Sequence, residues 1–99
     1  GDTYEGQFKQ GQMEGKGVLT TARGDVYQGD FKNGFKHGKG VINYADGVSQ
    51  YDGDWHYNKI EGSGRSVDEH GNVYEGEFRD NYRSGQGRCY YAEGFRFEG

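Results

Sequence analysis

The chain has 99 residues, a formal net charge of −4 and a single cysteine, Cys89. The acidic balance disfavours nucleic acid and anionic membrane surfaces as partners, and no apolar run approaches the roughly 20 residues that span a bilayer. One cysteine cannot form an internal disulfide, which favours a reducing, cytoplasmic setting.

Glycine and aromatic residues dominate the composition. There are 20 glycines, no proline and 16 aromatic residues, against nine residues of valine, isoleucine and leucine together. So few aliphatic side chains are typical of disordered chains. A folded chain of this composition is still possible if the aromatic residues recur at a fixed period, because the rings then supply the buried surface of a repeat architecture.

An aromatic residue does recur every 23 or 24 positions, at Tyr4, Tyr27, Tyr51, Tyr74 and Phe97. A glycine follows two residues after each of these rings. A second ring follows four residues after the first four, at Phe8, Phe31, Trp55 and Phe78. The chain therefore divides into four units, about 1–23, 24–46, 47–70 and 71–93, and a partial fifth, 94–99, with no segment of linker composition.

Each unit predicts a β-hairpin. In the second unit, residues 27–31 alternate apolar or small side chains with polar ones, which indicates a half-exposed strand. Asn33-Gly34 is the strongest short hairpin signal, because both central residues of a type I′ turn need positive φ. The whole pattern predicts eight strands in one antiparallel meander and no helix longer than a turn. Its turns fall near 10–11, 22–24, 33–34, 45–47, 57–58, 69–71 and 80–81.

A two-residue turn also predicts a register. It places Tyr27 opposite Gly40, Gly29 opposite Gly38, and Phe31 opposite Lys36. The Tyr27 ring can then lie across Gly40, which explains a glycine inside a strand. In the first unit, the same register places Glu5 opposite Lys16.

The connections between units carry their own signals. Residues 22–24 suit a three-residue loop with Gly24 in the left-handed region. The third unit has one extra residue among 48–50, which would turn Tyr51 and Trp55 to the wrong face unless a bulge absorbs it. It also has Asn58 where the first two units have a turn glycine, so we expect a local irregularity there.

The second unit contains Tyr27-Gln28-Gly29-Asp30-Phe31, Asn33-Gly34, His37-Gly38-Lys39-Gly40 and Tyr44-Ala45-Asp46-Gly47. This pattern, repeated over residues 1–99, resembles the MORN (membrane occupation and recognition nexus) repeat family. The resemblance implies an all-β protein with a single elongated, twisted antiparallel sheet and an aromatic-lined groove. It also implies a scaffold that binds partner segments and sometimes dimerises.

No catalytic, metal or cofactor site stands out. The recurring acids lie among lysines and arginines on the solvated face, so cross-strand charge pairing is their simplest role, and no concave pocket is expected around them. His37, His56 and His70 occupy three different repeat positions, short of the roughly four converging ligands of a zinc site. Cys89 has no neighbouring base and is expected to be a partly buried thiol.

The aromatic face is the candidate binding surface. A single-layer sheet has no second layer to cover its rings, so a row of them should stay partly open and mark an interface. The predicted partner-binding residues are Tyr4, Phe8, Tyr27, Phe31, Tyr51, Trp55, Tyr74 and Phe78. The sequence thus favours a non-catalytic scaffold that holds a partner peptide or amphipathic helix. Self-assembly into a homodimer, a membrane-associated cytoskeletal scaffold, and the accessory region of a larger enzyme remain open alternatives.

Overall fold

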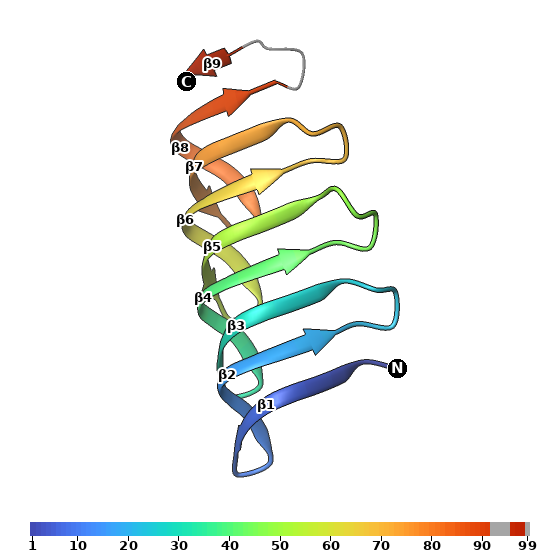
Figure 1. The fold of residues 1–99 in the computed structure, drawn as a ribbon. Coiled ribbons are helices and arrows are strands. Elements are labelled where there is room, and N and C mark those ends of the chain that lie inside the picture. The colour runs from blue at the N-terminus through green and yellow to red at the C-terminus, as the bar shows by residue number, and fades with distance from the viewer. Residues whose placement is uncertain (92–95, 99) are drawn as a thin grey trace.

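The computed structural model describes residues 1–91 and 96–98 and shows one open antiparallel sheet, 47 × 26 × 16 Å (Figure 1). Nine strands follow one another in chain order without a crossover. They are β1 (Thr3–Lys9), β2 (Gln12–Thr20), β3 (Val26–Lys32), β4 (Phe35–Asn43), β5 (Gln50–His56), β6 (Lys59–Val67), β7 (Val73–Arg79), β8 (Tyr82–Tyr90) and β9 (Arg96–Glu98).

This architecture confirms the predicted all-β meander, and no helix occurs within the described ranges. The prediction of eight strands falls one short, because β9 in the partial fifth unit pairs with β8, Phe97 lying opposite Cys89. Gly94 and Gly99, which continue the glycine pattern, lie outside the described residues.

The predicted register holds next to the turn and is wrong beyond it. Phe31 does pair with Lys36, but Gly29 pairs with Gly40 and Tyr27 with Ile42. Between these pairs, β4 has three residues where β3 has only Asp30, so two residues of β4 bulge out of the ladder. Gly38 allows this bulge because it adopts a φ of +100°. A regular ladder counted outward from the turn cannot include such a bulge, which is why the prediction failed.

The bulge bends every hairpin sharply. In Figure 1 the strands turn back at one side of the molecule, so that the sheet forms a trough with two arms. We call the part that ends in the three- and four-residue loops the loop arm, and the part that ends in the two-residue turns the hairpin arm. The centroids of Tyr27 and Phe31 are only 5.0 Å apart, although four residues of straight strand span about 13 Å. The rings therefore lie on the inside of the bend.

The core is a row of edge-to-face rings between the arms. Phe31 packs 5.0 Å from Tyr27 of its own unit and 5.1 Å from Tyr4 of the preceding unit. Trp55 and Phe78 repeat this arrangement, each meeting the tyrosine of its own unit and that of the unit before. Edge-to-face pairs at this distance add to the free energy gained by burial, so neighbouring units stabilise one another.

The turns follow the prediction, with two corrections in the third unit. The Thr21 N–H donates to the Asp25 carbonyl at 2.8 Å, which closes the predicted three-residue loop, and Gly24 has a φ of +103°. The extra residue is absorbed by a longer loop rather than a bulge, because the Tyr44 N–H bonds to the Ser49 carbonyl. That loop is held by the Asp46 carboxylate, which accepts from the Ser49 N–H at 2.7 Å.

Asn58 causes no irregularity. Its φ of +71° matches the left-handed conformation that glycine adopts at Gly34. Its Oδ1 accepts from the Lys36 N–H, and its own N–H donates to the Lys36 carbonyl, both at 2.9 Å. Asn81 binds the backbone of Ile60 in the same way. The asparagine therefore supplies a bond between units that glycine cannot make.

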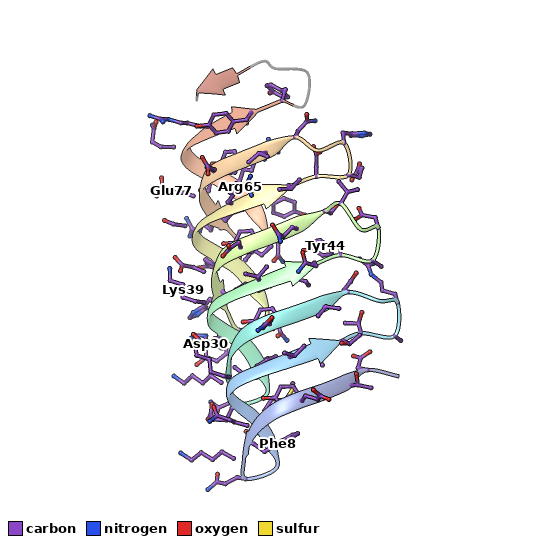
Figure 2. All side chains as sticks on the ribbon, in the orientation of Figure 1. Phe8, Asp30, Lys39, Tyr44, Arg65 and Glu77 are labelled. Carbon is purple, nitrogen blue, oxygen red and sulfur yellow. The ribbon has the colours of Figure 1, made fainter. Side chains whose placement is uncertain are left out.

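Charged side chains line the outer side of the bend, as predicted, but with different partners. Glu5 pairs with Val18 rather than Lys16. Lys16 forms an ion pair with Asp30 on the next strand, and Lys39 repeats this with Asp54. In Figure 2 the labelled Asp30, Lys39 and Glu77 follow this outer edge. The Asp30 Oδ2 also accepts from the bulged Lys39 N–H at 3.1 Å, so the carboxylate stabilises the bend itself.

Candidate functional site

The eight rings predicted to bind a partner form most of the core. Six of them, Tyr27, Phe31, Tyr51, Trp55, Tyr74 and Phe78, are at most 7 % exposed. Tyr4 is half-buried, and Phe8, at the β1 end of the array in Figure 2, is 62 % exposed. The expectation that the row stays partly open along the whole array is therefore wrong for these six, because the bent sheet covers its own inner face and needs no second layer.

The polar atoms of these rings are used inside the fold. Tyr27 Oη donates to the Asp30 carbonyl at 2.7 Å, and Trp55 Nε1 donates to the Gly40 carbonyl at 3.0 Å. Burial, with the Asp54 charge beside it, raises the pKa of Tyr51 to about 12. These hydroxyls consequently remain protonated at neutral pH and serve as hydrogen-bond donors to the bend.

A hollow of about 520 Å³ lies on the inner side of the trough, from the end of the second unit to the fourth. The loop arm contributes Tyr44, Ser66 and Asp68, and the hairpin arm contributes Ile60, Tyr82 and Arg83. Tyr51 and Phe78 of the core also line it. We call this space and its continuation along the trough the inner groove. Tyr82 is 76 % exposed, so a large ring stands open at its rim.

One repeat position on the hairpin arm faces the core rings all along the groove. It is the residue that pairs with the second ring of each unit, and it is occupied by Met13, Lys36, Ile60 and Arg83. Sequence reasoning had found Phe31 opposite Lys36 but gave this position no role. The residue types at this position alternate between apolar and cationic from unit to unit, and this alternation could have indicated a role.

The two cations of this row lie over aromatic rings. Lys36 Nζ is 5.7 Å from the centroids of both Tyr27 and Trp55, and the Arg83 guanidinium is 4.8 Å from that of Tyr74. Burial lowers the pKa of Lys36, although the charges of Asp25 and Asp2 oppose this effect. Both positions are within the range where a cation is attracted to the face of a ring.

The outer face has a shallow hollow of about 590 Å³ near Glu5, Lys16, Val18, Gln28 and Val41. The expectation of no concave surface around the acids is wrong to this extent. Glu5 is the one carboxylate that lines it, and Lys16 is already paired with Asp30. General acid–base catalysis by paired carboxylates needs a second acid, which the lining of this hollow does not provide.

Two of the three histidines meet across β4 and β5, which the sequence did not predict. The rings of His37 and His56 are 5.0 Å apart, and His37 Nδ1 accepts from the Tyr57 N–H at 3.3 Å. Burial, the neighbouring His56 and Lys32 lower the pKa of His37. Cys89 is half-buried. Within residues 1–91 and 96–98, no three His, Cys, Asp or Glu side chains converge on a point that could hold a metal ion.

The family model of the MORN repeat matches residues 4–26, 27–49, 51–72 and 74–96. Each match begins on the first tyrosine of its unit, at Tyr4, Tyr27, Tyr51 or Tyr74. The chain belongs to the MORN repeat family. MORN repeats are in general modules that interact with proteins or membranes, and the family is known for non-catalytic roles.

No individual curated protein matches this MORN chain. Across the part of the chain that the structure describes, there is no helix with the length and apolar character that crossing a membrane requires.

Proposed function

We propose that this MORN array is a non-catalytic scaffold that holds a peptide or helix of a partner protein in its inner groove. The observation that carries the proposal is the hollow between the arms, where Tyr44, Ile60 and Tyr82 surround an open space. Exposed or half-exposed aromatic side chains around a concave surface are typical of protein interfaces. The core rings support this surface from below, and of the eight predicted residues Tyr51 and Phe78 also line the hollow.

The test compares aromatic truncations inside and outside the groove. Tyr44→Ala and Tyr82→Ala remove rings that line the hollow. Phe35→Ala and Tyr57→Ala remove rings that contact each other at the hairpin turns, 42 % and 40 % exposed. Each variant is first shown to be folded, and its affinity is then measured for a partner identified by cross-linking.

Truncation at a binding hot spot costs about 2 kcal/mol or more, a loss of roughly 30-fold in affinity. We expect that loss for the Tyr44 and Tyr82 variants and near-unchanged binding for the Phe35 and Tyr57 variants. The reverse pattern would place the interface on the outside of the hairpin arm and refute the groove.

Self-assembly is the second candidate, and one observation favours it. Phe8 contacts Tyr4 at 4.9 Å but remains 62 % exposed. In the structure β1 pairs with β2 on one side, and the other side of such a strand can add a strand of a second copy. Light scattering on the unmodified chain and on Phe8→Ser tests this candidate. A concentration-independent monomer mass for the unmodified chain would exclude self-assembly through β1.

A further inference from the structure

The inner groove has a charge pattern that its carboxylates do not neutralise. Among the described residues, the Lys36 ammonium and the Arg83 guanidinium form no ion pair within 4 Å, whereas Lys16, Arg23 and Lys39 do. Besides its contact with the Tyr74 ring, Arg83 donates a weak hydrogen bond to Cys89 Sγ at 3.7 Å. Two cations thus lie on the hairpin arm over aromatic rings, with no described carboxylate within 4 Å of either.

The carboxylates of the opposite wall are already occupied. Asp25 is 7 % exposed. Its Oδ1 accepts a hydrogen bond from the Ala45 N–H, and its Oδ2 accepts one from Arg23 Nε. Asp68 accepts from the N–H groups of His70 and Asn72 and from the Asn72 side chain. These acids hold the loops of the array. They satisfy backbone donors of the loop arm. Neither acid forms an ion pair with Lys36 or Arg83 within 4 Å, although the charge of Asp25 acts on Lys36 from farther away.

The spacing of the two cations follows from the sheet. Lys36 and Arg83 occupy the same position two units apart, with Ile60 between them. Four strand spacings of about 4.8 Å separate the cations by about 19 Å. A helix covers that distance in about 13 residues at 1.5 Å per residue, and an extended strand covers it in about six.

Building on the proposed function, we propose that the inner groove selects an acidic peptide segment, with two carboxylates about 19 Å apart that flank an apolar residue. The carboxylates contact Lys36 and Arg83, and the apolar side chain packs on Ile60. The net charge of −4 does not prevent this, because charges farther away than the Debye length, about 8 Å at physiological ionic strength, are largely screened. Charge selects the partner and its register, and the aromatic lining contributes apolar contact area.

The experiment selects a displayed library of random 16-residue peptides on the full chain. The test variant carries Lys36→Met with Arg83→Met, which keeps an unbranched stem on the rings and removes the charges. The control carries Lys32→Met with Arg79→Met, which removes the same charge from the exposed outer surface of the same two units. Fluorescence of Trp55 establishes that both variants fold.

We expect enriched peptides with Asp or Glu at two positions, either about 13 or about six residues apart. They should bind the control as tightly as the unmodified chain and bind the Lys36/Arg83 variant about tenfold more weakly or worse. Enriched peptides without an acidic preference that still lose affinity to Tyr82→Ala would overturn the charge selection and leave the groove as the binding site. No enrichment over the bare support would overturn the charge selection and the proposed function together.

Discussion

Gly40 lies directly under the Tyr27 ring, and adding one methyl group there tests the packing that every unit shares. A Cβ on Gly40 would lie 2.5 Å from Tyr27 Cε2, and closer still to Cζ and Oη. Ordinary contact begins near 3.4 Å, so the ring would have to move by about an ångström. Gly17, Gly64 and Gly87 lie under the tyrosines of their own units in the same way.

The ring has little freedom to move. Tyr27 is 1 % exposed, it touches Phe31 and Trp55 edge-on, and its hydroxyl donates to the Asp30 carbonyl. Overpacking at such a site costs about 1–3 kcal/mol. At a central value of about 2 kcal/mol, the midpoint of a domain of this size falls by about 8–16 °C. Without the ring, alanine would instead stabilise the strand by about 0.5–1 kcal/mol, because glycine loses more conformational entropy on folding.

The opposite signs make the measurement decisive. Trp55 is the single tryptophan and is buried against Tyr27, so its fluorescence during heating or urea titration reports on this packing. We expect Gly40→Ala to lower the midpoint in the unmodified chain and to leave it equal or raise it in a Tyr27→Leu background. A raised midpoint for Gly40→Ala alone would show that the ring does not occupy that space.

Three further outcomes follow from particular contacts. Asn58→Gly should lower the free energy of unfolding by about 1 kcal/mol, because it removes the side-chain hydrogen bond to the Lys36 N–H. Asn58→Ala should lower it by about 1–2 kcal/mol more, because alanine is strained in the left-handed region; urea titration of both variants checks that order. Phe31→Ala should cost about 3–5 kcal/mol and the exposed Phe8→Ala much less; equal losses in thermal melts would contradict the packing. The Lys16 hydrogen bond and the Lys39 N–H, partly opposed by burial, hold the pKa of Asp30 below its usual value. The Asp30 carboxylate therefore contributes to stability above the pKa that it has in the unfolded chain, about 4, and this contribution is lost as the pH falls through its lower pKa in the folded protein. Urea titrations should accordingly show a flatter decline of the midpoint between about pH 5 and pH 2 for Asp30→Asn than for the unmodified chain.

Much of the fold was readable from the repeat. The 23-residue period, the alternation in 27–31 and the turn at Asn33-Gly34 predict antiparallel hairpins, and the strands occupy those positions. The ring of Tyr27 does lie on Gly40, although Gly40 pairs with Gly29. The predicted contact is correct although the predicted register is wrong, because a tyrosine side chain is long enough to reach a diagonal neighbour on the next strand.

The candidate site was less readable. The aromatic residues were chosen for their chemical type, which is the same for a core ring and for an interface ring. The row of Met13, Lys36, Ile60 and Arg83 varies from unit to unit and so resembles a tolerant surface position. Only the bend of the sheet brings Ile60 and Arg83 of this row to the same hollow as Tyr44 and Asp68.

The sequence alone determined the elements, because strand alternation and turn chemistry depend on neighbours within a few residues. The tertiary structure decided the bend. A glycine accepts positive and negative φ almost equally, so only the complete packing of Tyr27, Asp30 and the Lys39 backbone selects a φ of +100° at Gly38. That choice turns a flat sheet into a trough, and it thereby decides which rings are buried and which side chains remain open to a partner.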